Sequence, residues 1–196
     1  MTADDPVPAL VLAGGASRRM GTDKRLALID GVPMLRRTLD RLAATPCLVV
    51  FDPHDPPRIA MPDHARLVAD TRPGEGPLAA IEAGLLATDA PVVGVVAADT
   101  PWVEPEVLAL LARALAIDPS APMACLEDDQ GTPPLPLALR RGATLALVTR
   151  LLDQGERRLR ALLPHARAVE SAVWRKVDPE GRSLRDVDTP RDLVAT

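Results

Sequence analysis

The hydrophobic positions of this chain form short, continuous runs separated by polar turns. Runs of strand length occur at residues 7–12, 47–51, 66–69 and 91–98. The last run holds four valines and no charged residue before the chain reaches Asp99. A strand buried on both faces of a parallel sheet has this continuous apolar character. We therefore expect four buried strands that run parallel to one another.

Apolar residues between these runs recur at helical spacing. This spacing predicts helices at residues 33–44, 78–88 and 104–117. Pro33 and Pro105 each suit the first turn of a helix. A short extended piece at 25–29, with a turn at 30–31, and a loop rich in Pro and Asp at 52–63 complete this half. Strands that alternate with helices predict an α/β fold with a largely parallel sheet.

The remainder of the chain has a less regular pattern. We expect strands at 122–126, 135–139 and 183–187, helices at 143–152 and 156–163, and a last helix that begins at 189–190. The acidic residues 127–129 are typical of a solvated hairpin tip.

Three loops follow the carboxyl ends of predicted strands. They span residues 14–24, 70–77 and 99–102. In open α/β sheets, ligands bind beyond the carboxyl ends of the strands. We therefore expect all three loops to meet at one rim of the sheet and to form the functional site there.

Composition narrows the classes of ligand. The chain has 196 residues, 47% of them hydrophobic, which suits a single domain with a substantial core. Its net charge of −4 argues against a general nucleic-acid or membrane partner, and 2% aromatic residues leave little for base stacking. Residues 1–8 lack the features of a signal peptide, so we expect a cytoplasmic protein. Cys47 and Cys125 fit buried, reduced thiols.

The loop at residues 14–24 has the chemistry of a phosphate site. It holds glycines and cations but matches neither G-x-x-x-x-G-K-[ST] nor G-x-G-x-x-G. Lys24 is one of only two lysines among 23 basic residues. A lysine is a compact charge that suits a phosphate oxygen, whereas an arginine imposes a planar fork. A triphosphate ligand and a solvated surface lysine both fit Lys24 at this point.

Two carboxylates stand at strand ends. Asp99 ends the valine-rich run, and Asp70 ends the run before it along the chain. A carboxylate at this edge of the sheet is suited to bind Mg²⁺ on a triphosphate. Both aspartates also suit a turn or a helix cap, so both interpretations stay open.

Taken together, these loops resemble those of the MobA-type nucleotidyltransferases, which are molybdenum cofactor guanylyltransferases of the GT-A-like superfamily. Residues 12–24 read LAGGASRRMGTDK, close to the family opening LAGG-x-S-x-RMG-x-DK. Residues 69–71 and 76–79, ADT and GPLA, resemble its second motif, and residues 99–101, DTP, resemble its metal motif. GERRL at 155–159 and DVDTP at 186–190 resemble its later motifs.

The resemblance implies a fold and a reaction. The fold is a Rossmann-like, three-layer α/β/α nucleotidyltransferase fold with a mostly parallel, mixed central sheet. In the reaction, the terminal phosphate of molybdopterin attacks the α-phosphate of GTP, and pyrophosphate leaves. Phosphoryl chemistry of this kind depends on positioning and charge stabilisation more than on a covalent nucleophile. Residues 1–118 would bind the nucleotide and residues 119–196 the acceptor. Contact with other proteins of cofactor biosynthesis is compatible with this role.

The resemblance also implies site residues. Catalysis would depend on Lys24, Arg19 and Asp99, with Mg²⁺ as the cofactor on Asp99. The nucleotide would be bound by Leu12, Ala13, Gly14, Gly15, Lys24, Asp52, Asp70 and Asp99. The acceptor side would include Arg157, Arg158 and Asp188, although a surface role fits the two arginines equally well.

Two departures from the family pattern keep alternatives open. Residues 51–54 read FDPH where the family has an asparagine-bearing segment, and residues 186–190 read DVDTP where guanylyltransferases have N-x-NTP. The second departure resembles cytidylyltransferases of the same cofactor, whereas LAGG favours the guanylyl branch. The alternatives are a cytidylyltransferase, a nucleotidyltransferase for another phosphorylated small molecule, or a non-catalytic nucleotide-binding accessory protein.

Overall fold

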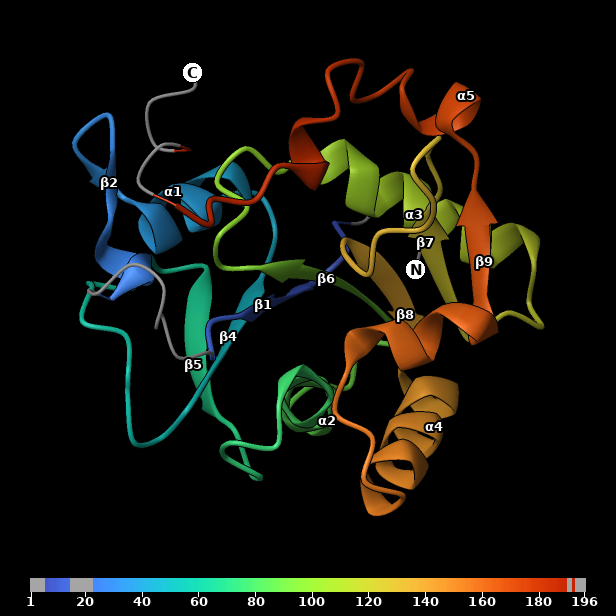
Figure 1. Cartoon of the computed structure of the whole chain (residues 1–196), viewed down its shortest axis with the longest axis horizontal. Coiled ribbons are helices and arrows are strands. Elements are labelled where there is room, and N and C mark those ends of the chain that lie inside the picture. The colour runs from blue at the N-terminus through green and yellow to red at the C-terminus, as the bar shows by residue number, and fades with distance from the viewer. Residues whose placement is uncertain (1–5, 15–22, 190–191, 193–196) are drawn as a thin grey trace.

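A seven-stranded sheet forms the centre of the computed structural model, which describes residues 6–14, 23–189 and 192 (Figure 1). The strands are β1 (Ala9–Leu12), β4 (Cys47–Phe51), β5 (Ala65–Ala69), β6 (Val92–Ala97), β7 (Met123–Leu126), β8 (Leu137–Arg140) and β9 (Ala166–Val169). Their order across the sheet is β5-β4-β1-β6-β8-β7-β9. β8 runs antiparallel to both of its neighbours, and the other pairs are parallel. The expected mostly parallel, mixed sheet is confirmed.

Helices cover both faces of this sheet. They are α1 (Met34–Arg41), α2 (Pro77–Leu86), α3 (Pro105–Ile117), α4 (Arg141–Asp153) and the short α5 (Ser171–Trp174). Figure 1 shows α1 and α3 above the strands, and α2 and α4 below them. Alternate residues of β1 explain the two layers, because Leu10 packs with the α2 and α4 face while Val11 packs with the α1 and α3 face. The three-layer α/β/α arrangement follows from a sheet with two apolar faces.

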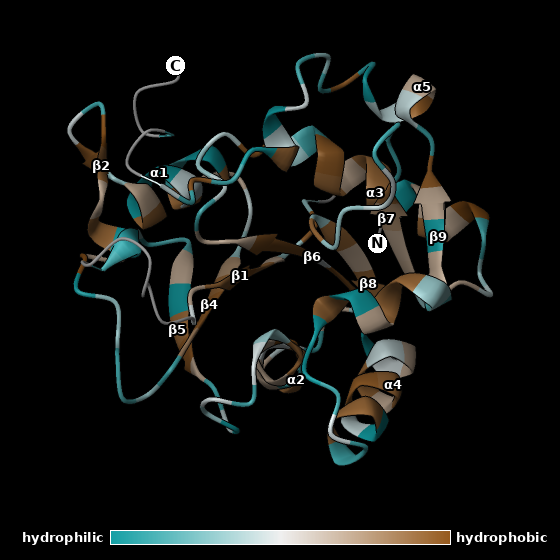
Figure 2. Ribbon diagram, in the orientation of Figure 1, coloured by the Kyte–Doolittle hydropathy of each residue, from teal (hydrophilic) through white to brown (hydrophobic). Residues whose placement is uncertain are grey.

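The apolar interior follows the strands, and polar residues collect in the loops and on the outer faces of the helices (Figure 2). β1, β4 and β6 are almost fully buried, as their continuous apolar sequences predict. Cys47 and Cys125 are buried free thiols, as expected. Burial raises the pKa of Cys47 to about 12 and that of Cys125 to about 11, so both stay protonated. Within the described residues, no helix combines the length and the apolar character that crossing a membrane requires.

The sheet topology changes direction at β1. The chain first builds β4 and β5 on one side of β1 and then crosses through α2 to build β6 on the other side. All four of these strands are parallel, so their carboxyl ends lie at one rim. Ligands of open α/β sheets bind in the crevice at such a switch point. The expected meeting of the three strand-end loops is confirmed for their described parts.

Several local expectations are wrong. The helix predicted at 33–44 is shorter at both ends. Residues 42–44 form a turn after α1, and residues 32–33 form strand β3 (Val32–Pro33), which pairs with β2 (Leu28–Ile29) in a hairpin. Asp30 and Gly31 make its turn with φ of 51° and 79°, respectively. The helix predicted at 156–163 is a 3-10 helix, η2 (Leu159–His165), and β9 follows it without having been predicted.

The strand predicted at 183–187 is also wrong. Residues Arg182–Leu184 form the 3-10 helix η3 instead. The buried carboxylate of Asp178 accepts hydrogen bonds from the backbone N–H groups of Arg182 and Ser183, each at 2.8 Å. These bonds curl the chain into a turn where a strand would keep it extended. The last helix, predicted from 189–190, lies largely outside the described residues.

Candidate active site

Two neighbouring pockets lie beyond the carboxyl ends of β1, β4, β5 and β6. We call the first the lysine pocket. Its volume is about 280 Å³, and its lining includes Leu12, Ala13, Gly14, Lys24, Arg25, Pro77, Asp99, Leu135 and Leu159. We call the second the aspartate pocket. Its volume is about 460 Å³, and its lining includes Leu12, Gly14, Arg25, Asp52, Asp55, Asp70, Gly74, Gly76 and Pro77. The shared residues make the two pockets adjoining halves of one site.

An ion-pair cluster marks the lysine pocket. The Lys24 ammonium lies 2.7 Å from Asp99 Oδ2 and 2.8 Å from Asp188 Oδ1. The Lys24 side chain is only 14% exposed, whereas that of Asp188 is 53% exposed. Lys24 belongs to the 3-10 helix η1 (Lys24–Leu26), and Asp99 follows β6. The sequence predicted Lys24 and Asp99 at one site, and the structure brings them into contact.

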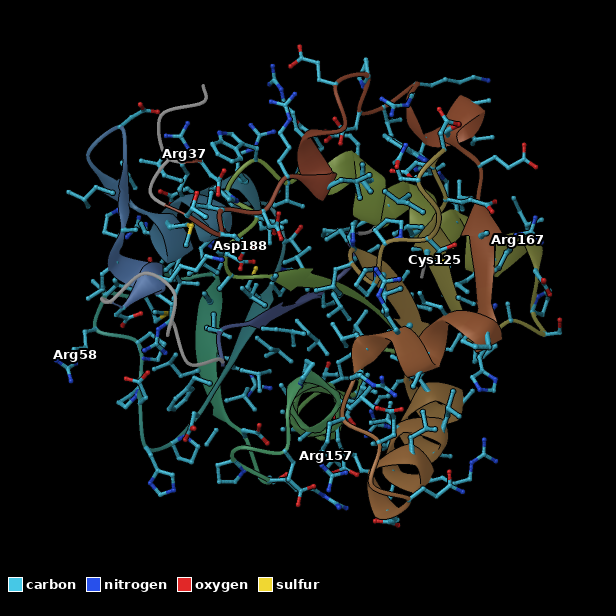
Figure 3. All side chains as sticks on the ribbon, viewed as in Figure 1. Arg37, Arg58, Cys125, Arg157, Arg167 and Asp188 are labelled. Atoms are coloured by element: carbon cyan, nitrogen blue, oxygen red, sulfur yellow. The ribbon has the colours of Figure 1, made fainter. Side chains whose placement is uncertain are left out.

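The C-terminal segment reaches this site by crossing the end of β6. The N–H of Val187 donates to the carbonyl oxygen of Asp99 at 3.0 Å. The Val187 side chain is fully buried in a small cluster with Ile29 and Met34. This anchor carries Asp188 to Lys24, and Figure 3 shows Asp188 beside α1. A predicted acceptor-side residue therefore lies in the same cluster as the predicted phosphate ligand.

The charges of this cluster act on one another. Burial alone would lower the pKa of Lys24, but hydrogen bonds to Asp188 and Asp99 outweigh it and raise that pKa. Burial, together with the charges of Asp188 and Asp99, raises the pKa of Asp186. Among the described residues of this cluster, carboxylates therefore outnumber the ammonium of Lys24.

The backbone after β1 forms the shared wall of the two pockets. The N–H of Ala13 donates to the carbonyl oxygen of Val50 at 2.8 Å, which commits this donor to the sheet. Ala13 nevertheless lines the lysine pocket, and Gly14 is the described glycine that faces both pockets. Gly15 and Arg19, which were also predicted to act here, lie outside the described residues.

Carboxylates line the aspartate pocket. Asp70 Oδ1 accepts a hydrogen bond from the Arg72 N–H at 2.8 Å, and Asp52 Oδ1 accepts one from the His54 N–H at 2.9 Å. Burial, followed by the charges of Asp52, Glu75 and Glu82, raises the pKa of Asp70. Asp70 is thus a carboxylate that gains from a ligand able to donate hydrogen bonds.

The three predicted acceptor-side residues do not come together. Figure 3 shows Arg157 below α2, well separated from Asp188. Arg157 donates to the carbonyl oxygen of Leu152 at 2.8 Å and lies 3.2 Å from a carboxylate oxygen of Glu75. Its side chain therefore ties the segment before η2 to the loop after β5.

Arg158 has a different environment from Arg157. Its side chain is 82% exposed and pairs with Glu156 at 3.1 Å. Hydrogen bonds from the Arg158 side chain and the neighbouring backbone lower the pKa of Glu156 to about 2. Of the two predicted arginines, Arg158 is the one that presents its charge to solvent.

Sequence reasoning missed Arg25, which lines both pockets. The side chain is buried and paired with Asp23 and Asp55. The sequence carried no signal for it beyond its position next to Lys24, because its partners are set by tertiary contacts.

The carboxylates of the lysine pocket have the donor chemistry that Mg²⁺ prefers. In the described part of the chain, no group of three or more His, Cys, Asp or Glu side chains is arranged to hold a metal ion by itself. Mg²⁺ commonly takes one or two carboxylates and completes its shell with water and substrate phosphates. Asp99 with Asp188 suits a metal that arrives with a nucleotide.

A family model described as the MobA-like NTP transferase domain matches residues 9–169 of the chain. The chain belongs to the MobA-like NTP transferase family. This membership makes it a nucleotidyltransferase, in agreement with the resemblance read from its motifs.

Other family members are similar over most of their length. A probable molybdenum cofactor guanylyltransferase from Chloroflexus aggregans is 36% identical over 193 residues, which cover 94% of this chain and 90% of that protein. A second probable enzyme of this name, from Deinococcus radiodurans, is 38% identical over 164 residues, 84% and 82% of the two chains. The similarity to these relatives therefore extends over most of the chain.

Solved structures show the same fold. Molybdopterin-guanine dinucleotide biosynthesis protein A from Archaeoglobus fulgidus has a TM-score of 0.83 at 24% identity and covers 96% of each chain. The 4-diphosphocytidyl-2C-methyl-D-erythritol synthase from Anaerococcus prevotii has a TM-score of 0.67 at 16% identity and covers 96% of this chain and 95% of that one. The MobA-like fold of this chain is therefore shared with proteins whose names include a different nucleotide product.

Proposed function

We propose that the chain transfers GMP from GTP to the terminal phosphate of molybdopterin. An oxygen of the acceptor phosphate attacks the α-phosphorus of GTP. The bond from that phosphorus to the oxygen bridging to the β-phosphate breaks, and pyrophosphate leaves. The observation that carries the proposal is the contact of Lys24 with Asp99 and Asp188 beside the glycine loop. The names of the Chloroflexus and Deinococcus relatives support the choice of substrates.

The charges of the lysine pocket support a role for Mg²⁺. A triphosphate that approaches Lys24 also approaches the carboxylates of Asp99 and Asp188, which favours a ligand that carries a cation with it. Asp99, with Asp188 beside it, would hold Mg²⁺, which neutralises the phosphates and polarises them when bound. Lys24 exchanges carboxylate oxygens for phosphate oxygens and stabilises the charge that develops during transfer.

The aspartate pocket supports guanine as the base. Guanine presents two adjacent donors, N1–H and the N2 amino group, and a carboxylate can accept both. Cytosine presents a single amino donor beside the acceptor N3, whose lone pair a carboxylate repels. Asp70, whose pKa is raised by burial and by neighbouring acids, is the acceptor we assign to guanine, with Asp52 beside it.

Residues 119–196 supply the acceptor side in this proposal. Asp188 reaches the lysine pocket, and the solvent-facing guanidinium of Arg158 is available to the molybdopterin phosphate. Arg157 instead holds the loop after β5 through Glu75.

Two measurements test the function. Titration calorimetry with GTP, CTP and ATP in the presence of Mg²⁺ should show that GTP binds most tightly. Pyrophosphate release with purified molybdopterin should then require both GTP and Mg²⁺. Tighter binding of CTP would indicate the cytidylyl branch, which Asp186 and Asp188 in the last motif favour. GTP binding without pyrophosphate release would indicate a non-catalytic accessory protein.

A further inference from the structure

Arg25 lies where the lysine pocket and the aspartate pocket adjoin. It lines the lysine pocket and the aspartate pocket, and only 6% of the residue is exposed. We propose that Arg25 is a positioning residue that sets Lys24 and the base-side loop at a fixed distance from each other. This inference rests on the proposed function, because it assigns the two pockets to the two ends of one nucleotide.

Every N–H donor of the Arg25 guanidinium forms a hydrogen bond within the protein. Arg25 Nε and Nη2 donate to the Asp23 carboxylate at 2.8 and 2.9 Å. Nη2 also donates to Asp55 Oδ2 at 2.7 Å, and Nη1 donates to the carbonyl oxygens of Asp55 at 2.8 Å and Ala13 at 3.2 Å. A guanidinium has five N–H donors, and these bonds use each of them. Arg25 therefore acts on a nucleotide through its neighbours and not by direct contact.

On the lysine side, Arg25 holds two neighbours. Asp23 caps η1 by accepting the Arg25 N–H at 3.0 Å, so the same carboxylate fixes the turn that begins at Lys24. Ala13 belongs to the backbone segment after β1 that forms the shared wall, and it lines the lysine pocket. Loss of the guanidinium would release both Lys24 and this wall.

On the aspartate side, Arg25 holds the loop after β4. Asp55 accepts two hydrogen bonds from the Arg25 side chain, one at its carboxylate and one at its backbone carbonyl oxygen. The Asp55 N–H in turn donates to the carbonyl oxygen of Asp52 at 2.8 Å. The position of Asp52 in the aspartate pocket thus depends on the same guanidinium that fixes the turn of Lys24.

The chemistry of this joint requires arginine. A buried cation is tolerated only where its hydrogen bonds are satisfied, and Arg25 meets this condition. A lysine has three donors on one nitrogen and no planar fork, so it cannot reach all of these acceptors. Asp23 responds to this partner, since hydrogen bonds from Arg25 lower its pKa despite its burial.

The first test removes one of the groups that accept hydrogen bonds from Arg25. Asp55→Ala should weaken GTP binding, measured by calorimetry with Mg²⁺, by about tenfold. Asp40→Ala is the matched control, because Asp40 pairs with Arg36 at 2.8 Å and has a similar exposed fraction, 48% against 58% for Asp55. The control should leave GTP binding unchanged, and the melting temperatures of the two variants should be similar. Equal GTP affinity in both variants would overturn the proposal.

The second test separates positioning from general stability. Arg25→Lys should weaken the binding of inorganic tripolyphosphate with Mg²⁺ by about 100-fold in the native background. In a Lys24→Ala background, the same change should have no further effect, because Arg25 acts through Lys24. An equal loss in both backgrounds would show that Arg25 supports the fold only, and would overturn the proposal.

The outcomes also separate this inference from the proposed function. If Arg25→Lys does not fold, Asp55→Ala replaces it in the native and Lys24→Ala backgrounds. Tripolyphosphate affinity should then fall about tenfold in the native background and show no further loss in the Lys24→Ala background. A native chain that binds GTP and releases pyrophosphate, with additive Arg25 and Lys24 effects, would keep the function and remove the inference. A native chain that binds neither GTP nor tripolyphosphate would overturn both.

Discussion

The lysine pocket and the aspartate pocket share a wall but balance their charges differently. In the lysine pocket, the ammonium of Lys24 lies between Asp99 and Asp188, so cation and carboxylates are already paired. In the aspartate pocket, Asp70 faces other acids, and burial raises its pKa. The buried guanidinium of Arg25 lies where the two meet. The ion-pair cluster of the lysine pocket suits a ligand that arrives with its own cation. The carboxylates of the aspartate pocket suit a ligand that presents hydrogen-bond donors.

Asp99→Asn gives the largest expected effect and tests the metal side of this comparison. Turnover measured as pyrophosphate release across a range of Mg²⁺ concentrations should fall about 10³-fold, because the carboxylate that would hold the metal is lost. Chelation of Mg²⁺ in the native protein should have a similar effect. Asp129→Asn, in the exposed turn between β7 and β8, is the control. Turnover that persists in Asp99→Asn would remove Asp99 as the metal ligand.

Lys24→Ala tests the cation of the lysine pocket. GTP affinity should fall about 100-fold, because a charge-assisted contact to the phosphates is lost and the carboxylates of Asp99 and Asp188 remain. Calorimetry in the presence of Mg²⁺ measures the change. The exposed Lys176 is the other lysine of the chain, so Lys176→Ala is a matched control. If both variants bind GTP equally well, Lys24 has no place in the site.

Asp70→Asn tests the base side. The amide keeps one acceptor but adds a donor, so it should bind guanine less well and repel cytosine less. We expect the ratio of GTP to CTP affinity to fall about tenfold. Asp63→Asn, on the exposed surface before β5, should leave this ratio unchanged. An unchanged ratio in Asp70→Asn would place the base elsewhere.

Arg158→Ala and Arg157→Ala test the two arginines predicted on the acceptor side. Loss of Arg158 should raise the KM for molybdopterin a few-fold, about the effect of one exposed charge pair, and leave GTP affinity unchanged. Loss of Arg157 should instead lower stability by about 1 kcal/mol, because its hydrogen bond to Leu152 is lost. Steady-state kinetics and thermal melting distinguish the two, and the reverse pattern would contradict the assignment.

Asp186→Asn gives the smallest expected effect and concerns pH. In the folded chain, burial and the charges of Asp188 and Asp99 raise the pKa of Asp186 above its ordinary value of 3.8. Asp186 therefore reduces stability as the pH rises above 3.8 through its raised pKa. Removing this charge should raise the melting temperature at pH 7 by about 1–2 °C and have no effect near pH 3. A gain at pH 3 that equals the gain at pH 7 would contradict this origin.

The first half of the fold could be predicted because its signals are local. The run at 47–51 coincides with β4, and Pro105 begins α3 as expected. Continuous apolar sequence and first-turn proline act within a few residues, so no long-range contact is needed to interpret them. The 3-10 turn at Arg182–Leu184 was not predicted, because the buried carboxylate of Asp178 competes with a strand for the backbone N–H groups.

The candidate site divides in the same way. The sequence could predict three candidate site residues, Lys24, Asp70 and Asp99, because each stands beside a strand end or a glycine loop. Parallel strands place such ends at one rim of the sheet. Arg157 and Arg158 are neighbours in sequence, yet one is held by Glu75 and the other faces solvent. Their shared residue type could not reveal this difference, since it depends on which segment packs beside each.

The sequence by itself determined the class of fold, the rim of the sheet on which the candidate site lies, and the lysine and carboxylates of that candidate site. Tertiary structure alone decided that Asp188 contacts Lys24 across 164 positions of sequence. It also decided that Arg25 spends its donors on Asp23, Ala13 and Asp55. Apolar pattern records which faces are buried, but the partner of a buried charge is set by where distant segments cross, and that depends on the packing of the whole chain.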